Sequence, residues 1–189
     1  DTVVKLTLQR GKKVFTTSVV RGAVPVPTLD ASYMIRPHVL YVRLNKWGTQ
    51  TPIEFQQAYA DHASEGVERI LLDLRDNGGA YLQAATTLAS EFLSKGDLLV
   101  YNQGAHYPRE DFKCPRDGRL RNVPLTVLVN ENSASASEIF AGAMQDLDRA
   151  LIVGRRTFGK GLVQLPFELQ DHSVVRLTVA RYYTPSGRS

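Results

Sequence analysis

The sequence predicts an α/β fold, and three observations carry this prediction. Between residues 38 and 153, short apolar segments of strand length alternate with longer helical patterns, the order expected of parallel strands joined by helices. Val67–Leu74 is strongly apolar, with the continuous run Ile70–Leu72 at its centre, as in strands buried on both faces. With 189 residues, 43% of them hydrophobic and 22% charged, the chain can enclose one hydrophobic core.

The N-terminal part has a different character. Residues 1–22 contain two alternating strand patterns around a turn at Arg10–Lys12. A two-stranded hairpin is marginally stable alone, so this one is expected to pack on another module. Residues 23–36 begin with a proline-rich, extended stretch and are predicted to be a linker. A core domain is then expected over residues 37–189.

The first predicted core elements are a strand and a helix. His38–Leu44 has the pattern of a strand. Thr51 and Glu54 have the spacing of a capping box with proline between them, which predicts a helix from Thr51 to about Ser64. Gly66 is expected to end it.

The next elements repeat this order. Val67–Leu74 is the buried strand, and Asp76–Gly79 is a tight turn. A helix is expected over residues 81–94 because its apolar residues form one stripe. Residues 98–101 are predicted to be a strand and residues 102–121 a polar loop.

The last part of the chain is expected to hold one more strand–helix–strand unit and a hairpin. Leu125–Val129 reads as a buried strand, followed by a helix over 135–145 and a strand over 150–153. Residues 163–169 and 173–182 alternate as the two strands of a β-hairpin.

Composition excludes several classes of function. The net charge is +4, and the basic residues are scattered among acids, which disfavours nucleic-acid binding. The only cysteine, Cys114, cannot form an internal disulfide and lies in a polar loop without a catalytic motif. No apolar run approaches the roughly 20 residues that span a bilayer.

Ser135 is the first candidate for chemistry. It follows a buried strand and a turn of small residues, and it precedes a helix. At a helix N-terminus, unpaired N–H groups and the helix dipole can stabilise an oxyanion. Ser135 and Glu138 also have capping-box spacing, so the motif alone favours a structural cap.

Lys160 is the second candidate. It lies between Gly159 and Gly161, where the backbone can turn sharply. A lysine acts as a base only where burial lowers its pKa toward neutrality, and Gln164 could orient it. The motif alone favours a solvated surface turn, and it lacks the hydroxyl residue that a phosphate-binding loop needs after the lysine.

The turn at Asp73–Tyr81 is the third candidate. A buried strand runs into consecutive glycines and then a helix, a geometry that can present backbone N–H groups to an anion. The motif alone favours a plain strand-to-helix connection.

Taken together, these motifs resemble those of the C-terminal processing peptidases, also called tail-specific proteases. The resemblance covers nearly the whole chain and rests on five segments: Asp73–Gly79, Ser133–Glu138, Gly154–Gly161, Gln164 and Tyr182–Arg188.

The resemblance implies an endopeptidase with a Ser–Lys dyad, an acyl-enzyme intermediate, a crotonase-like ββα core and an attached PDZ domain, without metal or organic cofactor. By position, Ser135 is the nucleophile, Lys160 is the base and Gln164 holds the lysine. The oxyanion hole uses the N–H groups of Ala136 and Gly79. Residues 1–22 then correspond to the last strands of a truncated PDZ domain.

The sequence departs from the family pattern in three places. Ala80 stands where the family has a second glycine, and a positive φ there costs roughly 1 kcal/mol and can displace the oxyanion donor. The rest of the PDZ domain is absent. The segment that normally follows Tyr182–Arg188 is absent too.

Three other functions compete with this prediction. A non-catalytic peptide-binding member of the same fold is the leading alternative. An acyl-CoA enzyme is disfavoured because the Ser–Lys pair has no role there. A Ser–His arrangement is disfavoured because no histidine lies in a matching motif; the four are His38, His62, His106 and His172.

The resemblance also implies partners and a location. Polypeptides with accessible C-termini are the expected substrates, and nucleic acid is not expected as a partner. The family allows oligomers, and it allows membrane association only through segments outside this chain. A periplasmic or otherwise extracytoplasmic location is expected.

Overall fold

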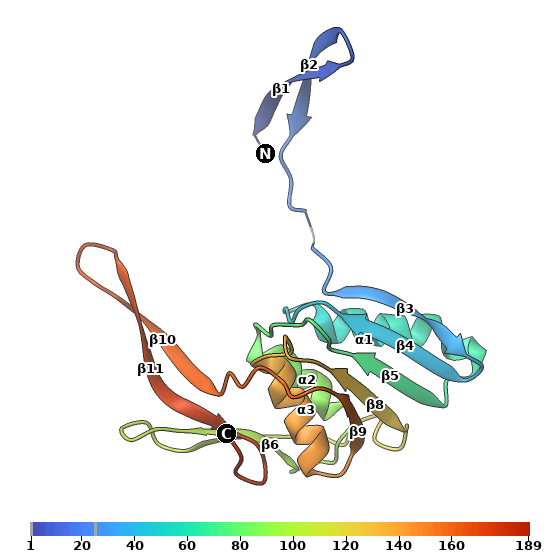
Figure 1. The fold of residues 1–189 in the computed structure, drawn as a ribbon, viewed down its shortest axis with the longest axis vertical. Helices are drawn as coiled ribbons and strands as arrows, with labels where there is room; N and C mark the ends of the chain where they lie inside the picture. Colours follow the sequence, from blue (N-terminus) through green and yellow to red (C-terminus); the bar gives the residue numbers. More distant parts are fainter. Residues whose placement is uncertain (1, 25) are drawn as a thin grey trace.

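The computed structural model describes residues 2–24 and 26–189. Three α-helices and two sheets form the body of the described residues, and two ribbons extend from it (Figure 1). The elements in chain order are β1 (Val3–Arg10), β2 (Lys13–Val20), β3 (Leu29–Arg36), β4 (Val39–Leu44), α1 (Thr51–Asp61), a 3₁₀ turn (Ala63–Glu65), β5 (Arg69–Asp73), α2 (Leu82–Ser90), β6 (Leu98–Gln103), β7 (Glu110–Lys113), β8 (Leu125–Val129), α3 (Ala136–Asp146), β9 (Ala150–Gly154), β10 (Leu162–Glu168) and β11 (Val174–Tyr183).

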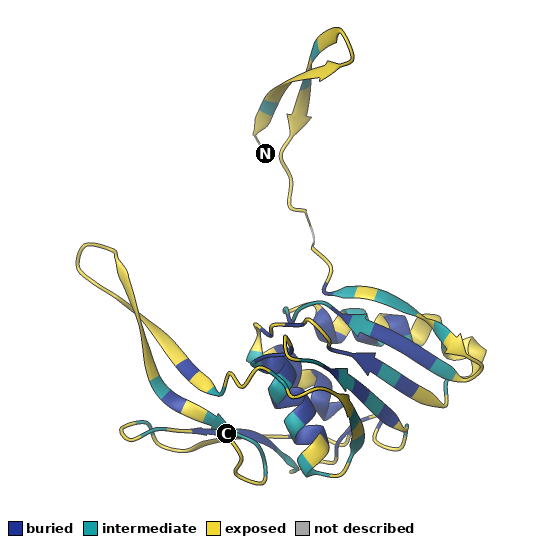
Figure 2. Ribbon diagram, viewed as in Figure 1, coloured by how far each residue is buried: buried dark blue, intermediate teal, exposed yellow. Residues whose placement is uncertain are grey.

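The larger sheet confirms the predicted α/β class. Its strand order is β3-β4-β5-β8-β9, and β4, β5, β8 and β9 run parallel to one another. Helix α1 contacts β3 and β4, α3 contacts β9, and α2 lies between the two helices. The core fills the space between this sheet and the helices, which is why the central strands are the most buried (Figure 2).

A second sheet has the order β10-β11-β6-β7. Helix α3 contacts both β9 and β6, so it lies between the two sheets. The hairpin of β10 and β11 was predicted and is confirmed. Strand β7 lies inside the predicted polar loop of residues 102–121; the sequence signal is missing because this strand is short, polar and at the sheet edge.

The predicted linker of residues 23–36 is wrong in its second half. Strand β3 occupies Leu29–Arg36 and pairs antiparallel with β4, so the core sheet begins before residue 37. The N–H groups of Thr28 and Leu29 donate to Glu54 Oε2 at 2.8 and 3.1 Å, which fixes the start of the strand. Residues 1 and 25, which belong to the predicted hairpin and linker, lie outside the described residues.

The same contact explains why the predicted capping box of α1 is wrong. Gln50 is the N-cap residue and makes no side-chain capping bond. Thr51 Oγ1 instead accepts from Gly48 N at 2.9 Å and donates to Thr28 Oγ1 at 2.8 Å. Glu54 is therefore used to bind strand β3 rather than the start of its own helix.

Two ribbons reach away from the body. The β1–β2 hairpin was predicted and is confirmed, with its turn at Gly11 (φ 63°). The second ribbon is the outer part of β10 and β11, and both are largely exposed (Figure 2). Whether β1 and β2 end a PDZ domain stays a prediction.

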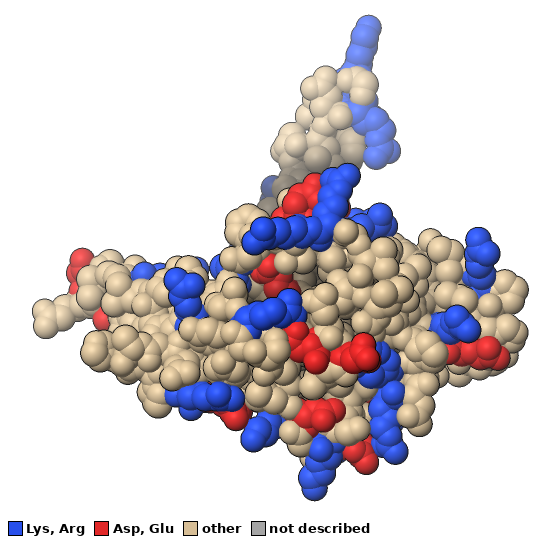
Figure 3. All heavy atoms as spheres, turned by 60° about the horizontal axis from the view of Figure 1, so that its bottom comes forward, with Lys and Arg blue, Asp and Glu red and all other residues tan. Residues whose placement is uncertain are grey.

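Basic residues are mixed with acidic residues on the molecular surface, as their scattered order in the sequence predicted. Figure 3 shows acidic and basic side chains interspersed over one face. Among the helices of the described residues, none has the length and apolar character needed to cross a bilayer.

Candidate active site

Ser135 lies where the turn after β8 enters α3. It is the N-cap residue of α3 and has φ 54° and ψ −113°. A positive φ is uncommon outside glycine, and such strained residues persist only where their surroundings hold them. Here Asn77 O accepts from Ala134 N at 3.1 Å, and Glu138 Oε2 accepts from Ser135 N at 2.7 Å.

The three serines of this turn are not equivalent. Ser133 is fully buried and donates to Leu74 O at 2.7 Å. Ser137 is also fully buried; it donates to Asn77 O and accepts from Trp47 Nε1, both at 2.9 Å. Only Ser135 is partly exposed. Its hydroxyl is therefore the one available to a substrate.

The structure agrees with the capping alternative for Ser135. Ser135 and Glu138 have both halves of a capping box: the Ser135 side chain faces the Glu138 N–H, and the Glu138 carboxylate accepts from the Ser135 N–H at 2.7 Å. A hydroxyl oxygen that faces an N–H as an acceptor keeps its own proton for donation. The capping role and a nucleophilic Ser135 are therefore compatible.

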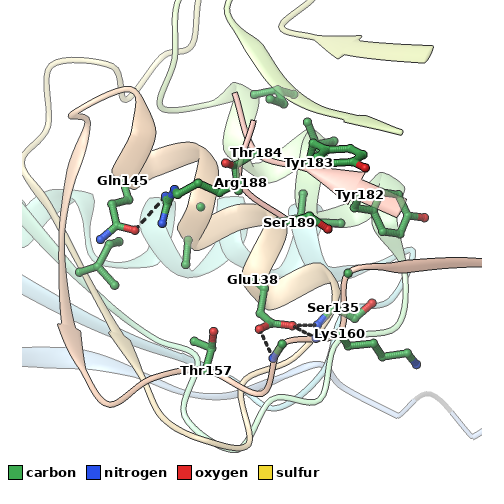
Figure 4. Close-up of a pocket in the computed structure, with 18 of the residues that line it drawn as sticks. Ser135, Glu138, Gln145, Thr157, Lys160, Tyr182, Tyr183, Thr184, Arg188 and Ser189 are labelled. Carbon is green, nitrogen blue, oxygen red and sulfur yellow. Dashed lines mark hydrogen bonds between the residues drawn. The ribbon is translucent and has the colours of Figure 1, made fainter. Parts of the chain in front are cut away.

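Glu138 also holds the lysine loop. Its carboxylate accepts from Gly159 N at 2.6 Å and from Lys160 N at 2.9 Å, as Figure 4 shows. Phe158 N donates to Ser133 O at 3.0 Å and adds a further bond between the two segments. One carboxylate thus joins the backbones of Ser135 and Lys160.

Ser135 and Lys160 line the same cavity, which has a volume of about 330 Å³. Within the part of the chain that the structure describes, however, the Lys160 amine makes no hydrogen bond to the Ser135 hydroxyl. Lys160 is exposed, and its side chain extends away from the Ser135 hydroxyl in Figure 4. Lys160 lies at the exposed rim of the cavity, so in this arrangement it lacks the burial that a lysine base requires.

Gln164 does not contact the lysine in this arrangement. It lies on β10, is exposed, and donates from Nε2 to Thr178 Oγ1 on β11 at 3.5 Å. It is not among the described residues that line the cavity. The structure thus brings together two of the three residues predicted for the catalytic centre.

The glycine turn approaches the serine turn closely. Gly79 has φ 95°, and a Cβ added there would lie 2.8 Å from Ser135 Cβ and 2.7 Å from Ala134 O. Only glycine fits this position. Its N–H, however, donates to Asn77 Oδ1 at 3.0 Å, so Gly79 is not a free oxyanion donor as predicted.

Ala136 remains as a donor. It is the first residue of α3, where N–H groups lack intrahelical acceptors. No acceptor for its N–H is found within residues 2–24 and 26–189. This N–H lies beside Ser135 and at the positive end of the helix dipole.

A buried ion pair anchors the start of the glycine turn. The Asp73 side chain is fully buried and accepts from Arg75 Nη2 at 2.6 Å and from Tyr41 Oη at 2.7 Å. Burial raises the pKa of Asp73, but the hydrogen bonds from Arg75 and Tyr41 outweigh it and lower the pKa overall. The carboxylate therefore stays charged and fixes the end of β5.

Ala80 has the strained backbone conformation that its place in the glycine turn suggested. Its φ is 132°, a region that favours glycine. We expect Ala80→Gly to stabilise the protein by about 1 kcal/mol, because the relief of strain exceeds the added entropy of the unfolded chain. Urea denaturation would measure this change.

Ala60→Gly is the matched control for this prediction. Ala60 is an exposed residue of α1, so the same substitution there is expected to destabilise the protein by about 1 kcal/mol. Equal destabilisation by both variants would contradict the strain at Ala80.

The histidines offer no alternative base. None of the four is among the described residues that line the cavity. His38 Nδ1 is 2.8 Å from Gly66 O, and His62 and His172 pair with nearby glutamates. No group of three or more metal-ligating side chains occurs in the described part of the chain.

Sequence reasoning missed two features of the site. Glu138 was identified only as a capping partner, although its bonds to Gly159 and Lys160 join segments distant in sequence. Asp146 carried no signal, yet it binds the Tyr182–Arg188 segment near the cavity. The Ser-x-x-Glu spacing was the one signal that could have pointed to Glu138.

Comparisons with known proteins identify the family of the chain. The model of Peptidase family S41 matches residues 38–189. A chloroplastic C-terminal processing peptidase of Tetradesmus obliquus is 42% identical over 149 residues, which are 78% of this chain and 32% of that protein. A probable CtpA-like serine protease of Staphylococcus epidermidis is 34% identical over 98% of this chain and 38% of its own length.

Solved structures share the fold. The photosystem II D1 C-terminal processing protease matches with a TM-score of 0.75 and 34% identity, over 99% of this chain and 52% of that one. A putative S41 protease from Bacteroides fragilis matches with a TM-score of 0.70 at 17% identity, over 97% of this chain and 55% of that one, and shows the fold alone. The chain spans about a third of the length of the two curated relatives, at 32% and 38%.

Proposed function

Because the chain belongs to peptidase family S41, we propose that it supplies the catalytic centre of a serine endopeptidase with Ser135 as nucleophile and Lys160 as general base. The observation that carries the proposal is the pairing of the two motifs through Glu138. This carboxylate fixes the Ser135 and Lys160 backbones together at one cavity.

The proposed reaction has two acyl-transfer steps. Neutral Lys160 takes the proton of the Ser135 hydroxyl, and Ser135 Oγ attacks the scissile carbonyl carbon. The protonated lysine then gives its proton to the leaving amine as the peptide bond breaks. Lys160 then takes a proton from a water molecule, whose oxygen attacks the acyl carbon. The bond from this carbon to Ser135 Oγ breaks, and the lysine returns its proton to Ser135 Oγ, which restores both residues.

The Ala136 N–H is the proposed oxyanion donor. It is the neighbour of the nucleophile at the N-terminus of α3, where the helix dipole also favours negative charge. Gly79 has a steric role instead, since it lets the glycine turn approach Ser135.

Lys160 must move for this reaction to occur. Its backbone is already fixed by Glu138, so rotation of the four-carbon side chain is the change required. A substrate lying over the rim would exclude water from the amine, and such desolvation favours the neutral form of a lysine. Gln164 could then hold the amine only if its present bond to Thr178 is given up.

Substrate and location follow from the relatives. The chloroplastic relative and the photosystem II D1 protease are named for C-terminal processing, so we propose polypeptides with accessible C-termini as substrates. A crotonase-like core, a PDZ origin for residues 1–22 and an extracytoplasmic location belong to the same proposal. Oligomer formation and membrane association would depend on parts outside this chain.

A peptide-binding protein without catalysis is the second candidate. The specific observation in its favour is the separation of the Lys160 amine from the Ser135 hydroxyl. Such a protein would bind extended peptides in the same cavity and leave them intact.

One experiment separates the two candidates. The intact protein is incubated with an unfolded polypeptide that ends in apolar residues, beside Ser135→Ala and the control Ser64→Ala. Ser64 is exposed and is not among the described residues that line the cavity. The peptidase proposal predicts cleavage by the wild type and the control but not by Ser135→Ala. Binding without cleavage by all three proteins would support the second candidate.

A further inference from the structure

The segment after β11 forms one wall of the cavity beside Ser135. Helix α3 lines the opposite side with Ile139, Gly142 and Gln145. The wall is formed by Thr184, Arg188 and Ser189, which face α3 in Figure 4. The position of the segment 184–189, here called the wall segment, therefore sets the width of the cavity.

Asp146, at the end of α3, holds the wall segment. Its Oδ2 accepts from Ser186 Oγ at 2.6 Å and from Ser186 N at 3.0 Å. Its Oδ1 forms an ion pair with Arg188 Nη2, which also donates to Gln145 Oε1 at 3.0 Å. Only 5% of the Asp146 side chain is exposed, whereas 56% of the Arg188 side chain is, so the carboxylate is shielded while its partner reaches the surface.

The carboxylate is ionised at neutral pH. Burial raises the pKa of Asp146, but the hydrogen bonds led by that from Ser186 outweigh it and lower the pKa to about 2. A shielded, charged acceptor of this kind forms stronger hydrogen bonds than a neutral one.

Gly142 gives independent evidence that this close packing is required. A Cβ added to Gly142 would lie 2.7 Å from Thr184 Cγ2. Glycine inside a helix costs roughly 1 kcal/mol relative to alanine. The helix thus accepts an unfavourable residue at the point where the wall segment touches it.

The wall segment also has an internal structure that depends on this anchor. Thr184 N donates to Arg188 O, and Gly187 N donates to Thr184 O, both at 2.8 Å. These bonds close a turn between Thr184 and Arg188. Asp146 attaches this turn to α3 at both Ser186 and Arg188, whereas Gln145 binds Arg188 alone, so loss of Asp146 would remove most of the polar attachment.

We propose that Asp146 is a positioning residue for substrate specificity, which holds the wall segment so that the cavity beside Ser135 accepts only side chains of limited size. The proposal rests on the proposed peptidase function, because the cavity would receive the substrate residue next to the scissile bond. The apolar part of its lining includes Val100, Ile139 and Tyr182, so the selected side chains are small and apolar.

The test compares side-chain preference with the reactivity of Ser135. Peptides that differ only at the residue before the scissile bond, with Ala, Val, Leu or Phe, are assayed with the intact protein and with Asp146→Ala. A shaped apolar pocket separates such residues by roughly 10- to 200-fold, and we expect this ratio to fall by about 10-fold in Asp146→Ala, mainly through KM. A small fluorophosphonate should label Ser135 of Asp146→Ala at the same rate as Ser135 of the intact protein.

Two further variants make the test specific. Asp146→Asn can still accept from Ser186 but loses the ion pair with Arg188, so it should restore part of the preference. Asp61→Ala removes an exposed aspartate of α1 and should leave all values unchanged.

The possible outcomes distinguish failure of the proposed role of Asp146 from failure of the proposed peptidase function. An unchanged preference in a folded, labelled Asp146→Ala overturns the inference alone. Loss of labelling in parallel with cleavage also overturns it, because Asp146 would then act on the dyad. A wild-type protein that neither cleaves nor reacts with the fluorophosphonate overturns the peptidase function, and the inference with it.

Discussion

A Lys160→Ala variant is expected to lose about 10²- to 10⁴-fold in kcat/KM, the range that a general base contributes. Alanine cannot take the proton of the Ser135 hydroxyl, and no histidine lines the cavity among the described residues to replace it. Steady-state cleavage of a peptide substrate measures the loss. The backbone of residue 160 should stay in place, because its N–H still donates to Glu138.

Lys160→Arg distinguishes a base from a mere positive charge. A guanidinium stays protonated in proteins, so arginine keeps the charge but cannot accept a proton. We expect it to be as inactive as Lys160→Ala. Lys95→Ala removes an exposed lysine away from the cavity and serves as the control. Activity in Lys160→Arg close to that of the wild type would show that the lysine acts only through its charge.

A Glu138→Ala variant is expected to have the second-largest effect. Three backbone N–H groups, those of Ser135, Gly159 and Lys160, would lose their common acceptor. Displacing a catalytic group by about 1 Å can cost about 10²-fold, so kcat/KM should fall by that order. Unsatisfied donors should also lower the free energy of unfolding by about 1–3 kcal/mol.

Glu131→Ala is a matched control for this variant. Glu131 also joins the turn after β8 to the lysine loop, through a 3.0 Å ion pair with Arg155. Both side chains are exposed, and exposed pairs contribute little to stability. Kinetics and urea denaturation should therefore stay near wild-type values. Similar losses in Glu131→Ala and Glu138→Ala would contradict a special role for Glu138.

Local sequence patterns predicted the elements of the fold well. The strand at Val67–Leu74, the helix after Ser135 and the hairpin after Gly161 all depend on periodicity within a few residues. Such patterns reflect which face of an element is buried. They do not say which distant side chain will satisfy a polar group.

The errors come from side chains whose partners the local motifs did not predict. Glu54 was assigned to the start of its own helix, but it binds Thr28, which lies 26 residues away. The Gly79 N–H was assigned to the oxyanion hole, but it donates to the side-chain oxygen of Asn77, two residues earlier in the same turn. The first competing partner is distant in sequence and the second is local, and neither was indicated by the pattern of apolar residues.

In the candidate site too, local motifs predicted the positions of the backbone turns but not the directions of the side chains. The sequence motifs correctly place Ser135 and Lys160 at one cavity, because each motif fixes its own turn. The side-chain directions of Lys160 and Gln164 were not predictable, because they depend on exposure at the rim and on Thr178 of the neighbouring strand.

The most direct test of the account is the rate and site of covalent labelling by a fluorophosphonate. The wild type should take up one label, and peptide mapping should place it on Ser135. Lys160→Ala should lose most of the labelling rate, whereas Lys95→Ala should keep it. Labelling of another residue, or an unchanged rate in Lys160→Ala, would contradict the proposal that Ser135 is activated by Lys160.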